Sequence, residues 1–357
     1  MLILNRNEIE IDKDMKSHVV IRADGDSSIG MGHIVRCMAL AEMIQNEFDI
    51  AFAIQEPSEN IVNLLKVITS NIIRLPSTID YQIDKFNFSK YLKPDDIVVL
   101  DGYHFKTDYQ REIKNRGCKL VCIDDIHAWH HVADVVINHA ADIDVSLYSA
   151  EKDTRFCLGL KYALLRKPFF YKLSEKRKIF TIKKGFISMG AADLNNLTPK
   201  FTEGLSQVKD FEEIHLMLGA LNPNLKEIQT LIDANKKVKI IPHFNIGAEE
   251  LSQLIKACDL AICPASNIAL ECCAIGIGLI SGYTAENQKG ILQGLVNRKT
   301  LINWGDLNAI SKVDIKERVE GLCNNPGVFH DLIINQKEVL DGRSPDRLLA
   351  IFKEISN

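Results

Sequence analysis

Residues 19–41 read VVIRADGDSSIGMGHIVRCMALA. The run Val19–Ala23 is short, apolar and rich in β-branched residues, which is typical of a strand buried on both faces. A glycine-containing turn follows, and from Ile34 onward the apolar residues recur at helical spacing. Strand, turn and helix in this order indicate the start of a parallel sheet whose strands are joined by helical crossovers.

The same alternation continues along the chain in two series. The first series of expected strands is Val19–Ala23, Ile50–Ile54, Ile97–Leu100, Leu120–Ile123 and Val135–Asn138. The second series is Gly185–Ser188, Glu213–Leu218, Val238–Pro242, Leu260–Cys263, Leu279–Ser281 and Thr300–Asn303. A basic, aromatic and non-periodic stretch separates the two series, as expected of a linker.

We therefore predict an α/β protein with two Rossmann-like parallel-sheet domains that face a cleft. The N-terminal domain covers residues 18–165, the linker 166–184 and the C-terminal domain 185–343. Residues 344–357 are expected to form a final helix, with Ser344 as its N-cap and Pro345 as its first helical residue. In such sheets, ligands bind where strands end and helices begin.

Composition excludes several classes of protein. The chain has 357 residues, a net charge of -4 and 25 % charged residues, as expected of a soluble globular protein. It has no basic stripe, which argues against nucleic acid as a partner. No apolar run reaches the roughly 18 residues of a membrane helix, and residues 1–17 do not resemble a secretory signal, so we expect a cytoplasmic protein without membrane insertion.

The turn after the first strand indicates an anion-binding site, and its glycine spacing argues against a nicotinamide cofactor. Gly30 and Gly32 let the backbone turn tightly and expose N–H groups to an anion. The third glycine of a dinucleotide fingerprint would stand at position 35, where the chain has Val35. His33 falls in the first turn of the following helix, whose dipole favours a neutral imidazole able to accept a proton. The alternative is that His33 only caps this helix.

Two further turns, in the second domain, suit a nucleotide diphosphate. One contains Gly190 after a strand, and the other leads through Ser266 and Asn267 into a helix that carries Glu271. A helix N-terminus with polar side chains is suited to phosphate oxygens, and a carboxylate one turn further can accept hydrogen bonds from ribose hydroxyls. The alternative for Glu271 is a solvated surface acid, although its neighbours are apolar.

Several blocks together resemble the UDP-sugar hydrolases of pseudaminic acid biosynthesis, which act on a UDP-linked 2,4-diacetamido-2,4,6-trideoxy-β-L-altropyranose. The blocks are Ile21–Ala41, Asp101–Tyr103, Ile123–Asp125, Leu158–Gly159, Tyr162–Arg166, Ser188–Asp193, Ser266–Gly276, Glu286–Gln288 and Asp341–Arg343. The resemblance spans residues 18–350 and implies the GT-B fold of the MurG-type glycosyltransferases.

This resemblance also implies the reaction. Water attacks the anomeric carbon with His33 as base, and UDP and a free diacetamido-trideoxy hexose are released. UDP is a good leaving group, so the second carboxylate of an ordinary glycosidase is unnecessary. The implied site residues are His33 and Tyr103 for catalysis, Gly190, Ser266, Asn267 and Glu271 for UDP, and Asp24, Gly30, Gly32, Glu286, Asn287 and Gln288 for the sugar.

Neither a cofactor nor a metal is expected, because the histidine-rich stretch 124–131 has no zinc-ligand spacing. The expected partners are the UDP-sugar and other enzymes of the nonulosonic acid pathway. Two other functions remain open: a MurG-like GT-B glycosyltransferase, in which an acceptor hydroxyl replaces water, and a non-catalytic protein that binds nucleotide sugars.

Overall fold

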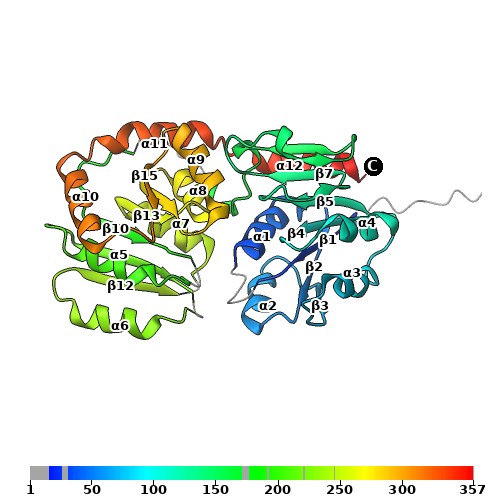
Figure 1. The fold of residues 1–357 in the computed structure, drawn as a ribbon, viewed down its shortest axis with the longest axis horizontal. Coiled ribbons are helices and arrows are strands. Elements are labelled where there is room, and N and C mark those ends of the chain that lie inside the picture. The colour runs from blue at the N-terminus through cyan, green and yellow to red at the C-terminus, as the bar shows by residue number, and fades with distance from the viewer. Residues whose placement is uncertain are drawn as a thin grey trace, which may run out of the picture.

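The computed structural model describes residues 16–25, 31–170, 177–190, 193–219, 222–244 and 246–356. Figure 1 shows two lobes side by side, each built around one sheet. All the strand pairings in both sheets are parallel. The predicted fold class, two Rossmann-like α/β domains, is therefore confirmed.

The first lobe contains a seven-stranded sheet. Its strands, in spatial order, are β3 (Ile72–Leu75), β2 (Asp49–Gln55), β1 (His18–Ala23), β4 (Ile97–Asp101), β5 (Lys119–Ile123), β7 (Val135–Asn138) and β9 (Arg155–Leu158). Its helices are α1 (Gly32–Ile44), α2 (Glu59–Leu65), α3 (Tyr81–Ser89) and α4 (Thr107–Asn115). The strand order reverses between β1 and β4, and such a point is where doubly wound sheets bind their ligands.

The second lobe contains a six-stranded sheet with the corresponding order. Its strands are β12 (Lys239–Phe244), β11 (Glu213–Leu218), β10 (Lys184–Ile187), β13 (Leu260–Pro264), β14 (Gly278–Tyr283) and β15 (Ile302–Asp306). Its helices are α5 (Leu197–Ser206), α6 (Leu225–Ala234), α7 (Ala248–Ala257), α8 (Asn267–Ile275), α9 (Lys289–Asn297), α10 (Lys312–Asn324) and α11 (Val328–Val339). Here the order reverses between β10 and β13.

Several short elements connect these parts. A small ribbon pairs β6 (His130–His131) with β8 (Ser149–Ala150), and single 3-10 turns are η1 (Val145–Leu147), η2 (Leu160–Tyr162), η3 (Lys167–Phe169) and η4 (Glu286–Gln288). The η3 turn lies in the stretch 166–184 that we propose as the linker. None of the helices in the described part of the chain is long and apolar enough to cross a membrane.

Side-chain alternation along the strands produces a core on both faces of each sheet. In β1, Val19 and Ile21 pack with α1, whereas Val20 packs on the opposite face with residues of α3 and α4. Successive side chains of a strand point to opposite faces, so a strand covered on both sides is apolar throughout. This is why the central strands could be predicted from short apolar runs.

The final helix, α12 (Ser344–Ile355), returns to the first lobe, where Figure 1 shows it in red. Leu348 and Phe352 belong to the same apolar cluster as α1. The prediction that Ser344 is the N-cap is wrong, because the helix already begins at Ser344 and its N-cap is Arg343. The Ser344 hydroxyl instead donates a hydrogen bond to the Ala163 carbonyl at 2.8 Å.

Candidate active site

A histidine–aspartate pair lies at the point where the strand order of the first sheet reverses. His33 stands in the first turn of α1, and Asp101 is the last residue of β4. His33 Nδ1 lies 2.7 Å from Asp101 Oδ1 and 3.1 Å from Arg36 Nη2. Because the shorter contact is to a carboxylate, which only accepts, we assign the Nδ1–H to the hydrogen bond with Asp101. That tautomer leaves Nε2 without a proton, and Nε2 can therefore act as a base.

Arg36, one turn further along α1, fixes the Asp101 carboxylate. Its Nε and Nη2 each donate to one carboxylate oxygen at 2.6 Å, and its Nη1 donates to Asp125 Oδ2 at 2.9 Å. Burial alone would raise the pKa of Asp101, but Arg36 and His33 together hold that pKa well below its usual range. Asp101 is therefore ionised near neutral pH and can stabilise an imidazolium on His33.

Tyr103 connects this pair to the second lobe. Its ring meets the His33 ring edge-on, with the centroids 4.9 Å apart. Asn287 Nδ2, in η4 of the other lobe, donates to the Tyr103 hydroxyl at 2.9 Å. Burial, and after it the charge of Asp125, raises the pKa of Tyr103, so this phenol keeps its proton. Tyr103 can therefore donate one hydrogen bond while it accepts another from Asn287.

A small cavity opens beside His33. It is lined by Asp24, His33, Tyr81, Asp101, Gly102, Tyr103, His104 and Phe105. Asp24 is held in place there, because it accepts hydrogen bonds from Arg22 Nη1 at 2.6 Å and from the Gln55 amide at 3.0 Å. Gly32 is the first residue of α1, whereas Gly30 lies outside the described residues.

In the second lobe, the N-terminus of α8 follows a strand directly, and such a helix end can bind an anion. Ser266 is the N-cap but makes no capping hydrogen bond with its side chain, and Asn267 is the first helical residue. Gly190 ends the neighbouring turn after β10 with φ +91, a conformation that L side chains rarely adopt, and a Cβ there would meet nothing within 4 Å. A bulky anion could approach the backbone at this point.

Glu271 is not a solvated surface acid, so that alternative is wrong. Only 3 % of the residue is exposed, and both of its carboxylate oxygens are bound by Arg166, from Nε at 2.8 Å and from Nη2 at 2.9 Å. The Arg166 guanidinium also lies over the Phe169 ring. Two of the roughly four lone-pair positions of the carboxylate remain for another donor.

The other two residues of the η4 turn, Glu286 and Gln288, interact with neighbouring residues of the second lobe. Glu286 forms an ion pair with Lys289 at 2.8 Å, and its side chain is 85 % exposed. Gln288 accepts a hydrogen bond from the Thr284 amide at 2.7 Å, which leaves its NH₂ group for another partner. The structure thus brings Asn287 to the His33 region through Tyr103 but gives Glu286 no such contact.

The histidine-rich stretch has a structural contact instead of a ligand set. Asp124 accepts a hydrogen bond from the His127 amide at 2.7 Å and so fixes the loop that follows β5. Among the residues that the structure describes, no group of three His, Cys, Asp or Glu side chains could hold a metal ion.

Sequence reasoning missed Asp101, Arg36 and Arg166 as site residues. The available signal for Asp101 was its place directly after the apolar run Ile97–Leu100, where a parallel strand ends. Arg36 lies one helical turn after His33 and could have been placed on the same face of α1. Nothing local in the sequence pairs Arg166 with Glu271.

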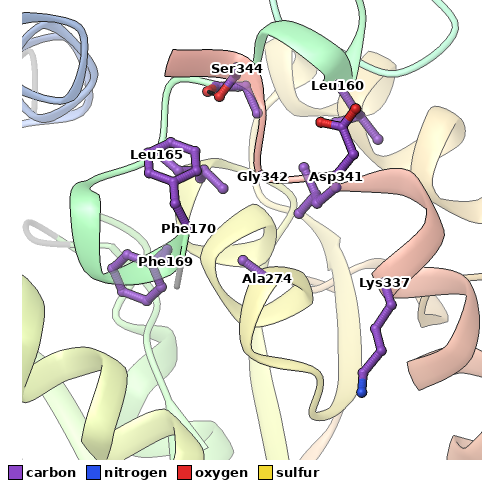
Figure 2. A pocket seen from close by; sticks show the side chains of 11 residues that line it. Leu160, Leu165, Phe169, Phe170, Ala274, Lys337, Asp341, Gly342 and Ser344 are labelled. Atoms are coloured by element: carbon purple, nitrogen blue, oxygen red, sulfur yellow. Dashed lines mark hydrogen bonds between the residues drawn. The ribbon is translucent and has the colours of Figure 1, made fainter. Parts of the chain in front are cut away.

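A larger cavity, of about 220 Å³, lies where the chain crosses between the lobes. Figure 2 shows its lining, which comes from the segment Leu160–Phe170, from Ala274 of α8 and from the segment Lys337–Ser344. Its lining includes neither His33 nor Glu271.

Comparison with known proteins supports the resemblance expected from the sequence. No family model matches the chain. The chain is 29 % identical over 258 residues to the UDP-2,4-diacetamido-2,4,6-trideoxy-beta-L-altropyranose hydrolase of Campylobacter jejuni, a match that covers 71 % of this chain and 86 % of that protein.

Solved structures show the fold. MurG of Acinetobacter baumannii aligns with a TM-score of 0.63 at 14 % identity, over 95 % of this chain and 99 % of its own. MnaA of S. aureus, solved with UDP, aligns with a TM-score of 0.67 at 11 % identity, over 95 % of this chain and 96 % of its own. This chain therefore has the GT-B fold of the MurG-like enzymes and is similar in sequence to the Campylobacter jejuni hydrolase.

Proposed function

We propose that this chain is a UDP-sugar hydrolase that converts a UDP-linked 2,4-diacetamido-2,4,6-trideoxy hexose into UDP and the free sugar. The observation that carries the proposal is the His33–Asp101 pair, a base with a fixed tautomer at the reversal point of the first sheet. The similarity to the Campylobacter jejuni hydrolase, which is named for this substrate, supports it.

In the proposed mechanism, His33 Nε2 takes a proton from a water molecule whose oxygen attacks the anomeric carbon. The bond between that carbon and the β-phosphate oxygen breaks, and its electron pair leaves with UDP. Asp101 stabilises the imidazolium, as the aspartate of a catalytic triad does. Since UDP leaves as a stable anion, no protonating acid is required, and attack from the opposite face inverts the anomeric centre.

We assign the proposed nucleotide subsite to the second lobe. The helix N-terminus at Ser266 and Asn267 would bind the diphosphate, and Gly190 would allow its close approach. Glu271 would accept hydrogen bonds from the ribose hydroxyls. The proposed sugar subsite comprises Asp24, Gly30, Gly32, Glu286, Asn287 and Gln288. Tyr103, beside His33, would take part in catalysis by orienting the sugar or the attacking water.

The proposal also covers the pathway, the cellular compartment and the metal requirement of the reaction. We place the reaction in pseudaminic acid biosynthesis in the cytoplasm, beside the other enzymes of that pathway, and without a metal ion. Turnover that persists at an unchanged rate in excess EDTA would support metal independence, whereas its loss and restoration by a divalent cation would contradict it.

The test is proton NMR of the protein with UDP-2,4-diacetamido-2,4,6-trideoxy-β-L-altrose, without an acceptor, and in parallel with UDP-GlcNAc. We expect UDP and free sugar from the first substrate alone. The variant His33→Asn should still bind UDP but lose about 10²–10⁴-fold in turnover, the usual contribution of a general base. Full turnover by that variant would refute the role of His33.

The rival function is that of a glycosyltransferase, because solved structures with this fold include glycosyltransferases such as CalG4. If neither substrate releases sugar while UDP still binds, a glycosyltransferase with an unidentified acceptor becomes the better assignment. Release from both substrates would support a hydrolase but contradict the proposed selectivity.

A further inference from the structure

A buried ion pair of the first lobe is connected to the cavity beside His33 through Asp24. Arg22 of β1 and Asp84 of α3 form the pair, and no part of either residue is exposed. Arg22 Nε and Nη2 donate to Asp84 Oδ2 at 3.3 and 3.1 Å, and Arg22 Nη1 donates to Asp24 Oδ1 at 2.6 Å. Asp24 lines the cavity together with His33, so the ion pair holds a residue of the cavity wall from behind.

Asp84 fixes both of the groups that hold Asp24. Besides Arg22, it binds the Gln55 side chain, whose Nε2 donates to Asp84 Oδ1 at 2.8 Å, and the Gln55 amide donates to Asp24 Oδ1 at 3.0 Å. The Tyr109 hydroxyl donates to Asp84 Oδ2 at 2.7 Å. A buried carboxylate with this many donors has little freedom to turn, so Asp84 orients Arg22 and Gln55, and these in turn orient Asp24.

The hydrogen bonds also determine which oxygen of Asp24 a ligand can reach. Oδ1 already accepts from Arg22 and from the Gln55 amide, which occupies its two lone-pair positions. Among the residues that the structure describes, the Tyr81 hydroxyl reaches Oδ2, at 3.4 Å, and Tyr81 lines the same cavity. Burial, and after it the charge of Asp24, raises the pKa of Tyr81 to about 12, so this hydroxyl keeps its proton. Oδ2 therefore has the capacity to accept one more hydrogen bond, on the side of the cavity.

We propose that Arg22 and Asp84 are positioning residues of the sugar subsite, which act through Asp24. They hold the carboxylate so that its Oδ2 accepts a hydrogen bond from an acetamido N–H or a hydroxyl group of the substrate sugar. An acceptor that is fixed in advance loses little conformational freedom when the sugar binds, which lowers the cost of binding. The inference rests on the proposed function in one respect, namely that the ligand of the cavity is the sugar of a UDP-sugar.

The test removes both charges of the ion pair together. Arg22→Met alone leaves Asp84 as a buried unpaired charge and should destabilise the protein, whereas Arg22→Met with Asp84→Asn should regain much of the stability. The amide of Asp84→Asn can still accept from Gln55 and donate to Tyr109. All variants are made in a His33→Asn background, so that the UDP-sugar is bound without rapid turnover. Thermal unfolding measures stability, and calorimetry measures the affinities for UDP-2,4-diacetamido-2,4,6-trideoxy-β-L-altrose and for UDP.

We expect the double variant to bind UDP as the background protein does, but to bind the UDP-sugar about fivefold or more weakly relative to UDP. Arg22→Lys keeps the charge but not the planar fork that reaches two carboxylates, and it should lower this ratio of affinities as well. A merely structural ion pair would leave the ratio unchanged in every variant that is folded and stable, and that result would overturn the inference.

A double-mutant cycle shows whether the ion pair acts through Asp24. Asp24→Asn keeps one oxygen for Arg22 but replaces the acceptor on the cavity side, so it should lower the ratio by a similar factor. Adding it to the double variant should cost little more, and additive losses would overturn the inference.

Lys114→Met is the matched control, because it removes an ion pair with Asp134 in the same lobe but outside this cluster. Its ratio of affinities should equal that of the background protein. If the affinities change as expected but the protein with His33 intact hydrolyses no UDP-sugar, the proposed hydrolysis is contradicted and this inference stands. A protein that binds neither UDP nor the UDP-sugar would overturn both.

Discussion

At the scale of single residues, Glu271 shows how a buried acid stays available for a ligand. Removing a carboxylate from water is costly unless it is paired and hydrogen-bonded. Arg166 supplies both conditions with two parallel hydrogen bonds and belongs to the proposed linker. The pair therefore joins the helix of the proposed nucleotide subsite to the segment between the lobes.

We expect Arg166→Met to weaken UDP binding about tenfold or more, because the unpaired carboxylate of Glu271 then favours protonation or moves away. Glu271→Gln should weaken it as well, and the double variant should be no weaker than the worse single variant. Calorimetry with UDP measures all three. Lys167→Met, a change at the exposed neighbouring residue, is the matched control and should bind normally.

The burial of His139, which directly follows β7, predicts that the stability of the protein depends on pH. Burial lowers the pKa of its imidazole from 6.5 to about 4. Between these two values the unfolded chain binds a proton that the folded chain does not, so stability falls as the pH falls through this window. The variant His139→Gln removes this contribution.

Urea unfolding of both proteins measures the effect. From about pH 7.5 to about pH 4.5, His139→Gln should lose about 2 kcal/mol less stability than the unchanged protein. Parallel losses in the two proteins would show that His139 does not carry this proton linkage.

At this scale, sequence reasoning could place single residues but not their partners. His33 was predictable because a turn and an amphipathic run define where its helix begins. Its partnership with Asp101 was not, because it requires that β4 be the neighbour of β1, and the spatial order of strands is not a local property. The same holds for Arg166 and Glu271, which lie 105 positions apart.

At the scale of elements, burial decides which strands could be predicted. Nearly every residue of β1 and β4 is buried, so both stand out as apolar runs. The two strands of the first sheet that were missed, β3 and β9, form its edges. Each carries an exposed arginine within four residues, Arg74 and Arg155, and an edge strand tolerates such residues because one side remains unpaired.

The start of α12 gives a prediction at this scale. The Ser344 hydroxyl is buried and bonds the Ala163 carbonyl, which ties the helix to the end of the first lobe's chain. Ser344→Ala should cost about 1 kcal/mol in unfolding free energy, since it leaves that carbonyl without its donor. Ser356→Ala, near the other end of the helix and more exposed, should change stability by less; equal losses would contradict the role given to Ser344.

At the scale of the whole molecule, one of the contacts between the two lobes is especially tightly packed. A Cβ on Gly294 of α9 would lie 2.4 Å from both the Cβ and the carbonyl oxygen of Ala141 in the first lobe. No side chain can be placed there unless α9 moves relative to the segment after β7. The relative position of the lobes therefore depends on a glycine.

Two alanine substitutions on one helix test this. Gly294→Ala should destabilise the protein by about 1–3 kcal/mol and lower turnover, because overpacking displaces one lobe against the other. Gly290→Ala, where a Cβ meets nothing within 4 Å, should be neutral or stabilising by up to about 1 kcal/mol. Thermal unfolding and the NMR assay measure both variants. Similar behaviour of the two would show that the Gly294 contact does not set the position of the lobes.

The return of α12 to the first lobe has a consequence for synthesis on the ribosome. Leu348, Ile351 and Phe352 fill a core whose other members lie between Val19 and Leu164. A nascent chain leaves the ribosome from its N-terminus, so most of that core is exported while these three residues are still untranslated. The lobe that is made first is thus completed last, after the whole second lobe has emerged.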